Sequence, residues 1–174
     1  MKKFPPILIL ISCVLTSYGQ DISNKYPGLI ARVKKVNKDK SLSKISLENE
    51  EFMDHLTDGG GELTGLYKND QIQKVIRKVF LSNGIEQFDY YFADGKLIFI
   101  YETFRAFKSL ESQGTFDYSK TEIEFIGRYY FQNTKLVDSE TTGHNRFEDD
   151  TIDIEKTLIA EMTDCLEHLN IKRK

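Results

Sequence analysis

The sequence predicts an α+β fold: an antiparallel meander sheet of about six strands, with a C-terminal amphipathic helix packed on its aromatic face and a short N-terminal helix. Three observations predict this fold. Aromatic and aliphatic residues alternate with polar residues over much of residues 62–137. Short turn signals separate these stretches, which is typical of hairpins. Residues 150–169 then follow the spacing of an amphipathic helix.

The composition is that of one ordinary globular domain. Of 174 residues, 29% are charged and 40% hydrophobic, and the formal net charge is −3. This balance lacks the basic surface that nucleic-acid binding requires, so no nucleic-acid partner is expected. The usual signatures of metal sites, phosphate-binding loops and catalytic nucleophiles are also missing, so we expect neither a metal nor a cofactor.

The chain begins with the features of an export signal. Lys2-Lys3 precedes an apolar run over residues 7–16, and Ser17-Tyr18-Gly19 places small residues at the −3 and −1 positions of a cleavage site. We therefore expect residues 1–19 to be a signal peptide and residues 20–174 to form a single α+β domain. The mature protein would then lie in the periplasm or outside the cell.

Lipidation is the alternative interpretation of the same segment. Leu10-Ile11-Ser12-Cys13 resembles the motif at which bacterial lipoproteins are cut, which would make residues 1–12 the signal and leave an acylated Cys13 as a membrane anchor. The apolar run is too short to span a bilayer, so no transmembrane span is expected. If Cys13 is removed with the signal peptide, Cys165 is alone in the mature chain, and no intrachain disulfide can form.

The first helix is predicted over residues 26–37. Ile30, Val33 and Val36 recur at three-residue spacing among basic residues, which indicates one apolar face. Pro27 suits the first turn of a helix, because its missing N–H has no helical partner there.

Polar and glycine-rich segments follow this helix. Residues 37–46 predict a loop, and residues 48–56 predict another helical turn or two. Gly59-Gly60-Gly61 then breaks the pattern and indicates a flexible turn into the sheet.

Residues 85–101 predict the central hairpin. Asp94-Gly95 suits a two-residue type I′ turn, because both residues tolerate the positive φ that this turn needs. The expected pairs on the core face are Phe92 with Leu97, Tyr90 with Phe99, and Phe88 with Tyr101. The expected pairs on the opposite face are Tyr91 with Ile98, and Asp89 with Ile100, so that face is of mixed polarity.

The following segment alternates between loop and strand patterns. Residues 108–118 hold Ser, Gly, Gln and charged residues, and predict a long loop. Residues 122–131 alternate cleanly as a strand, and Asn133-Thr134 turns the chain into one more strand.

Three of the turns share one sequence pattern: an aromatic residue, any residue, Asn or Asp, any residue, Lys or Gln, and an aliphatic residue. The three copies run from Tyr67 to Ile72, from Phe92 to Leu97, and from Phe131 to Leu136. The last two copies share a longer Tyr-Tyr-Phe start. In each copy the aromatic and aliphatic residues should face one another across the turn on the core side.

With Gly-Gly-Glu-Leu-Thr ahead of it, this pattern resembles small exported bacterial proteins, mostly uncharacterised, that carry repeated Tyr-Tyr-Phe-x-Asn/Asp-Gly-Lys-Leu hairpins. The resemblance covers residues 60–137 and departs at Thr134, where such proteins more often carry Gly. It implies a secreted β-rich domain and implies no known activity or functional residue.

The C-terminal helix is predicted over residues 150–169. Its apolar residues follow helical spacing, and Asp150 or Thr151 can cap its start. Cys165 belongs to the apolar stripe, which favours a small core residue over a nucleophile.

The mixed face of the sheet supplies the candidate binding site. Tyr91, Arg128 and Tyr130 should point there together over aliphatic residues, and such residue types dominate binding interfaces. Two interpretations remain open: the N-terminal helix covers this face, or the face is half exposed and binds a protein or small-molecule ligand. The leading function is therefore a non-enzymatic exported binding or interaction module of the cell envelope, using this face or residues 108–118.

The second function class is a small envelope hydrolase centred on His144. This histidine lies in a polar segment near Glu140, Glu148 and Asp149. A general base needs a carboxylate to orient it and a nucleophile or water to act on. His144 is the candidate catalytic residue for this hypothesis.

Overall fold

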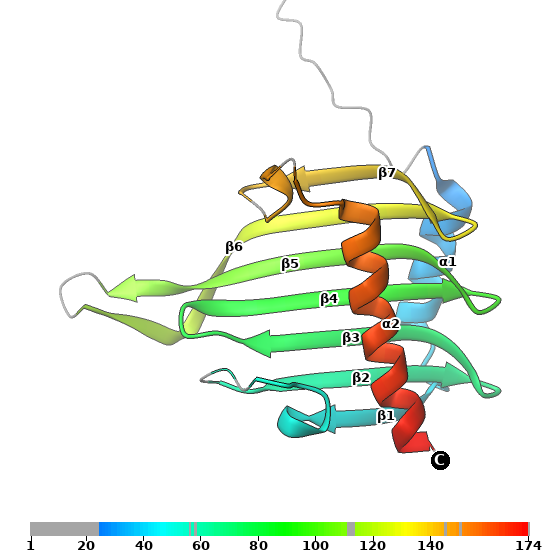
Figure 1. The fold of residues 1–174 in the computed structure, drawn as a ribbon, viewed down its shortest axis with the longest axis horizontal. Helices are drawn as coiled ribbons and strands as arrows, with labels where there is room; N and C mark the ends of the chain where they lie inside the picture. The colour runs from blue at the N-terminus through cyan, green and yellow to red at the C-terminus, as the bar shows by residue number, and fades with distance from the viewer. Residues whose placement is uncertain are drawn as a thin grey trace, which may run out of the picture.

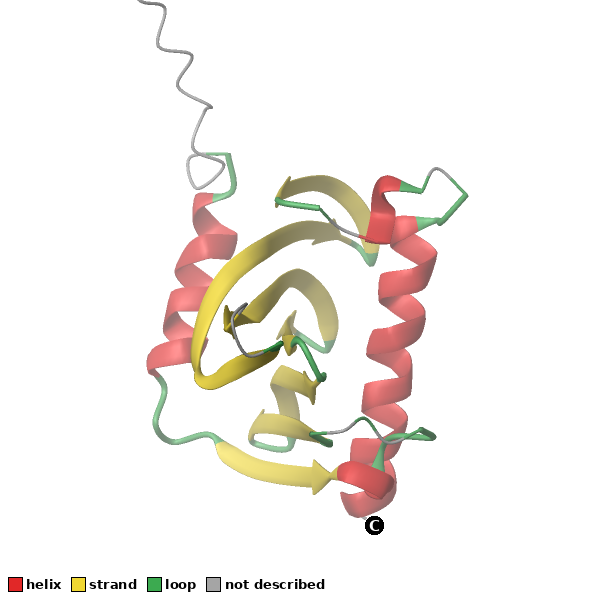
Figure 2. Cartoon of the chain, turned by 90° about the vertical axis from the view of Figure 1, so that its left-hand side faces the viewer, coloured by secondary structure: helices red, strands yellow, loops and turns green. Residues whose placement is uncertain are grey.

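The computed structural model describes residues 25–55, 57, 59–110, 114–144, 146–149 and 151–173. These residues form a seven-stranded antiparallel meander in which each strand pairs with the next one along the chain (Figure 1). Helix α2 lies on one face of the sheet and helix α1 on the other (Figure 2). The predicted α+β architecture is therefore confirmed, with one strand more than expected.

The elements are, in chain order, α1 (Pro27–Lys38), β1 (Ser43–Glu48), the 3₁₀ helix η2 (Asn49–Glu51), β2 (Gly61–Lys68), β3 (Gln71–Phe80), β4 (Gly84–Ala93), β5 (Lys96–Leu110), β6 (Thr115–Gln132), β7 (Lys135–Thr142), the 3₁₀ helix η4 (Arg146–Glu148) and α2 (Ile154–Arg173). The predicted signal peptide and Cys13 lie outside the described residues. None of the described helices is long and apolar enough to cross a membrane.

Both predicted helices are present, but the start of α2 is different. The Oδ1 atom of Asp153 accepts a hydrogen bond from the backbone N–H of Lys156 at 2.9 Å, which is the geometry of an N-cap. Thr151 lies ahead of the helix and instead bonds to Asp149. The expected cap at Thr151 is therefore wrong, and Asp150 lies outside the described residues.

Two segments that the sequence predicts as loops contain strand residues. Residues 37–46 were expected to form a loop, yet their last four residues belong to β1, which pairs with β2 at the edge of the sheet. Residues 108–118 belong largely to β5 and β6, which project together beyond the other strands (Figure 1). Edge and projecting strands have no fully buried face, so their sequences stay polar and lack the usual alternation.

The three repeated turns have one geometry. Their central residues all have positive φ: Asn69 49° and Asp70 62°, Asp94 50° and Gly95 74°, Asn133 51° and Thr134 65°. These values are those of type I′ turns. The aromatic and aliphatic residues face one another in each copy, as predicted.

A β-bulge follows each of these turns. Gln73, Ile98 and Val137 have no partner in the ladder, so the residues beyond them shift by one position. As a result, Tyr91 lies opposite Phe99 and Tyr90 lies opposite Ile100. The register expected beyond the Phe92–Leu97 pair is therefore wrong, because an inserted residue reverses the alternation.

The second turn position offers a test of this geometry. Gly95 has open space where a Cβ would stand, so a side chain there costs only conformational energy. We expect Gly95→Thr to lower the free energy of unfolding by about 1–2 kcal/mol and Thr134→Gly to raise it by about 1 kcal/mol. Urea denaturation of both variants measures the two effects. Shifts of the same sign would contradict the shared type I′ geometry.

The sheet has a core on each face. Phe88, Tyr90, Phe92 and Tyr129 pack under α2 with Leu158 and Leu169, as the sequence predicts for Tyr90 and Phe92. Cys165 belongs to this core, and burial raises the pKa of its thiol to about 12.

The second core lies between the sheet and α1. Tyr91, Phe99 and Tyr130 pack there against Val36 of the helix. Tyr91 and Tyr130 are each only 2% exposed. Of the two open interpretations, the one in which the N-terminal helix covers this face is therefore confirmed for these two residues, and the half-exposed one is wrong for them.

Candidate functional site

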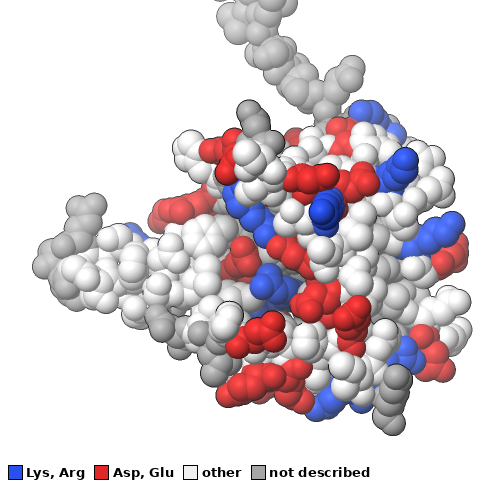
Figure 3. All heavy atoms as spheres, viewed as in Figure 1, with Lys and Arg blue, Asp and Glu red and all other residues white. Residues whose placement is uncertain are grey.

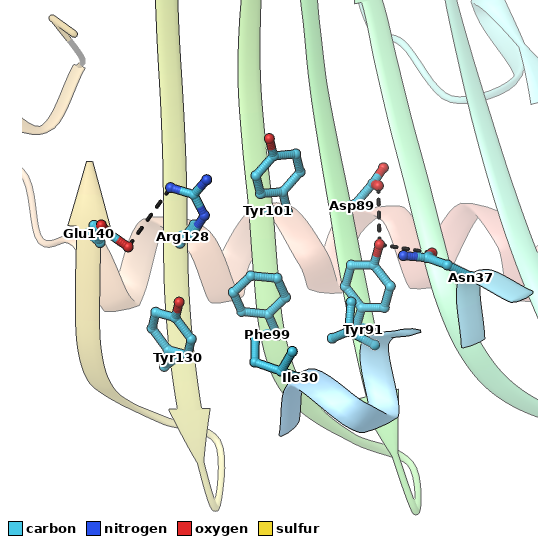
Figure 4. A pocket seen from close by; sticks show the side chains of 10 residues that line it. Ile30, Asn37, Asp89, Tyr91, Phe99, Tyr101, Arg128, Tyr130 and Glu140 are labelled. Atoms are coloured by element: carbon cyan, nitrogen blue, oxygen red, sulfur yellow. Dashed lines mark hydrogen bonds and ion pairs between the residues drawn. The ribbon is translucent and has the colours of Figure 1, made fainter. Parts of the chain in front are cut away.

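Two parallel rows of side chains cross the α1 face of the sheet. The aromatic row consists of Tyr91, Phe99 and Tyr130, which are ladder neighbours on β4, β5 and β6. The polar row consists of Asp89, Tyr101, Arg128 and Glu140, which are ladder neighbours on β4 to β7. Helix α1 packs on the aromatic row, and the polar row lies beside it (Figure 4).

The hairpin repeat explains why the aromatic row exists. In each Tyr-Tyr-Phe copy the second Tyr, Tyr91 or Tyr130, faces α1, whereas its neighbours face α2. Because of the bulges, the first ladder residue after each bulge also faces α1. These residues are Lys74, Phe99 and Asp138. Lys74 therefore lies at one end of the aromatic row and Asp138 at the other.

Helix α1 is held at both ends of this row. Near its start, the Tyr26 ring stacks on Tyr130 with centroids 4.9 Å apart, and Lys25 forms an ion pair with Asp138 at 2.6 Å. Near its end, the Oδ1 atom of Asn37 accepts hydrogen bonds from Lys74 Nζ at 3.1 Å and from the Tyr91 hydroxyl at 3.0 Å. The helix is therefore held against the sheet at both ends of the aromatic row.

A pocket of about 460 Å³ opens between α1 and the polar row. Its walls include Tyr91, Arg128 and Tyr130, the three residues that the sequence analysis singled out, and Ile30 and Val33 of α1. The volume falls within the range of small-molecule sites, roughly 300–1,000 Å³. Figure 4 shows the two rows that form its floor and its polar side.

Lys74 and Asp89 form a buried ion pair at one end of the pocket. Lys74 Nζ lies 2.7 Å from Asp89 Oδ2, and each side chain is 10% exposed. Burial alone would lower the pKa of Lys74, but the adjacent Asp89 carboxylate outweighs it and the pKa is raised. Burial, followed by the Asp89 charge, raises the pKa of Tyr91. At neutral pH the pair is therefore charged but has no net charge, and Tyr91 is neutral.

Arg128 lies at the other end with spare hydrogen-bonding capacity. Its Nη1 atom is 3.8 Å from Glu140 Oε2, too long for a hydrogen bond, and the two side chains are 32% and 43% exposed. Its guanidinium carbon lies 5.6 Å from the centroid of the Tyr101 ring. The guanidinium N–H groups of Arg128 make no hydrogen bond to another described residue.

The chain matches no protein-family model, no curated protein and no solved structure. In the part of the chain that the structure describes, no group of three or more His, Cys, Asp and Glu residues is arranged to hold a metal ion. The function is therefore inferred from the geometry of the site.

His144 does not approach the pocket walls described above. Its side chain is 99% exposed, and its Nδ1 atom lies 3.2 Å from Glu148. Glu140, its other expected neighbour, instead faces Arg128. The structure thus separates the two groups of candidate residues that the sequence suggested.

Sequence reasoning missed a polar cluster on the α2 face. Glu102 is 4% exposed and its Oε2 atom accepts a hydrogen bond from the Tyr129 hydroxyl at 2.8 Å. Arg146 Nε lies 3.9 Å from Glu102, and the same guanidinium forms an ion pair with Glu161 of α2. Charged side chains of both signs gather beside α2 on this face (Figure 3). Without the bulge at Ile98, alternation from the turn places Glu102 on the opposite face.

Glu102 should make stability fall with rising pH. Burial raises the pKa of this carboxyl from 4.5 to about 7. The folded chain then holds the proton more tightly than the unfolded chain, so stability is lost as pH rises from about 4.5 to 7. We expect this loss to be about 3 kcal/mol and to disappear in Glu102→Gln.

Urea denaturation at pH 5 and pH 8 measures this effect as a difference between variant and parent. Glu140→Gln, an exposed carboxylate on the other face, is the matched control and should leave the pH dependence unchanged. An equal pH dependence in Glu102→Gln and the parent would show that Glu102 is ionised throughout.

Proposed function

We propose that this protein is an exported, non-enzymatic binding module of the bacterial cell envelope, and that its ligand occupies the pocket between α1 and the polar row. One observation carries the proposal. Helix α1 buries the aromatic row but leaves Arg128 and Glu140 partly exposed beside it, around a pocket of about 460 Å³. Apolar walls with a few convergent polar groups are typical of small-molecule sites.

The rigidity of the pocket supports binding. Both ends of α1 are tied to the sheet, by Asp138 at one end and by Lys74 and Tyr91 at the other. The floor of the pocket comes from neighbouring strands of one sheet. A site that is formed before the ligand arrives loses little conformational entropy on binding, which favours affinity.

The composition of the pocket favours binding over hydrolysis. Its lining, as far as the chain is described, contains no Ser, Thr, Cys or His. Asp89, one of the two carboxylates that line the pocket, is already paired with Lys74. The alternative hydrolase would rely on His144, whose ring is 99% exposed and whose described contact is Glu148. A general base acts best when it is oriented and shielded, so we favour the binding function.

Three probes of similar size test the proposal: 3-phenylpropionate, 3-phenylpropan-1-ol and 3-phenylpropan-1-amine. We expect at least one to shift the backbone NMR signals of Tyr91, Phe99 and Tyr130 at millimolar concentration. Ile30→Trp fills the pocket from α1 and should abolish these shifts. Ala31→Trp, which adds the same side chain on the exposed side of the helix, should preserve them.

Melting temperatures of both tryptophan variants show whether α1 remains in place. If none of the three probes shifts these signals, the pocket is not a small-molecule site. Equal binding to the parent and to a folded Ile30→Trp variant would place the probe elsewhere.

A further inference from the structure

We propose that the ligand of this pocket carries a carboxylate, which Arg128 binds, while the apolar body of the ligand contacts the edge of the aromatic row that lines the pocket. This inference rests on the proposed function. The proposal identifies the chemical class of the ligand, a small amphipathic monoanion. It rests on the arrangement of Arg128, Tyr101 and Glu140 and on the charges around them.

Arg128 has both the donors and the orientation for this role. Guanidinium groups bind carboxylates through two parallel N–H···O bonds, and those of Arg128 are unused among the described residues. The cation–π contact with Tyr101, at 5.6 Å, holds the group on the polar row. Figure 4 shows Arg128 between Tyr101 and Glu140, above Tyr130.

Glu140 does not satisfy Arg128. Its carboxylate stays 3.8 Å away and is 43% exposed, and ion pairs this open contribute little to stability. A ligand carboxylate can therefore join Arg128 without breaking a strong interaction. In the empty pocket, Glu140 acts as a loose counter-ion that competes with the ligand.

The charge balance favours a monoanion over the alternatives. Lys74 and Asp89 neutralise each other, which leaves Arg128 as the cation that an incoming group can reach. A phosphate dianion would bring two negative charges next to Glu140, with one available guanidinium to offset them. An amine would have to approach Arg128 itself. One carboxylate matches one available guanidinium.

The aromatic row indicates that the rest of the ligand is apolar. Phe99 and Tyr130 lie side by side with ring centroids 5.1 Å apart and line the pocket together with Ile30. Aromatic and aliphatic walls gain free energy from an apolar body, through area burial and ring stacking. Tyr130 and Arg128 are two residues apart on β6 and both line the pocket. A short linker between the apolar body and the carboxylate of the ligand is therefore long enough.

The same three probes test the inference, because they differ in charge and share the phenyl group and three-carbon chain. At pH 7 and low salt, we expect 3-phenylpropionate to bind roughly tenfold or more tightly than the alcohol. Arg128→Gln should abolish this preference and leave the affinity for the alcohol unchanged. Arg128→Lys keeps the charge without the planar fork and should retain part of the preference.

Glu140→Gln distinguishes competition between Glu140 and the ligand from positioning of Arg128 by Glu140. If Glu140 competes with the ligand, its neutralisation should raise the affinity for 3-phenylpropionate several-fold and leave the alcohol unaffected. If Glu140 merely positions Arg128, the affinity should fall. Arg105→Gln, an exposed arginine on β5 outside the pocket, is the matched control and should change nothing.

Two results would overturn the inference in different ways. If the alcohol and the amine bind in the pocket as tightly as the acid, the pocket is a binding site but does not select carboxylates. If none of the probes binds there, the proposed function fails together with the inference. Weaker binding of the acid to Glu140→Gln would also contradict the competition that we propose.

Discussion

Phe92→Ala is expected to bring the domain close to unfolding. Phe92 is 1% exposed and lies in the core beneath α2, opposite Leu97. Truncating a buried Phe typically costs about 3–5 kcal/mol, a large share of the stability of a domain this size. Urea denaturation measures the loss. Tyr118→Ala, at a position 62% exposed on the projecting strands, is the control and should cost far less.

Tyr91→Ala should be nearly as destabilising, which the sequence alone did not suggest. The ring is 2% exposed, lies beneath Lys74 at 4.7 Å, and its hydroxyl bonds to Asn37 of α1. Its loss should loosen α1 as well as leave a cavity. A Tyr91→Ala variant with the parent's stability would show that α1 does not pack on this face in solution.

Lys74→Met is expected to cost about 3–5 kcal/mol, because it leaves the Asp89 carboxylate buried without its counter-ion. The remaining partners of Asp89 are hydrogen bonds from Gln87 at 2.9 Å and from Tyr91 at 3.4 Å, which offset only part of the charge. Chemical denaturation at neutral pH measures the loss.

The double variant Lys74→Met/Asp89→Leu should recover most of that stability, because neither charge is then left buried alone. Lys68→Met is the matched control. Its pair with Asp39 has the lysine side chain 48% exposed, so we expect a loss below about 1 kcal/mol. A double variant as unstable as Lys74→Met would show that the ion pair stabilises the fold by more than the mutual neutralisation of its two charges.

The turns and helices could be predicted because their causes are local. Asp94, Gly95 and Asn133 adopt the positive φ that Asp, Asn and Gly tolerate, and the flanking residues pair as the motif predicts. Thr134 adopts positive φ as well, although a β-branched residue disfavours it. Helix α1 begins at Pro27, and both helices follow the spacing of their apolar residues. Tyr90 and Tyr91 were assigned to opposite faces correctly, because they lie on the incoming strand, where nothing interrupts the alternation.

The strands within residues 108–118 could not be predicted from local sequence patterns. Their polar composition indicated a loop, but residues 108–110 belong to β5 and residues 115–118 to β6, and Phe107 and Tyr118 are in contact at a centroid distance of 5.0 Å. These strands form because β5 and β6 pair with each other, and the composition of one segment does not show which other segment it pairs with. β1 was missed for the same reason.

The pocket itself was decided by tertiary structure. Tyr91, Arg128 and Tyr130 could be grouped from the sequence, because they share a face near related turns. The polar row depends on bulges at Ile98 and Val137, each of which re-aims every residue beyond it.

What the sequence by itself determined is the set of local conformations and the near-turn pairs. What only the tertiary structure decided is which aromatic residues are covered and which charged residues stay beside an open pocket. The physical reason is that burial of Tyr91 and exposure of Arg128 depend on where α1 crosses the sheet. That crossing is set by contacts between residues far apart in the chain, such as Asn37 with Lys74 and Lys25 with Asp138.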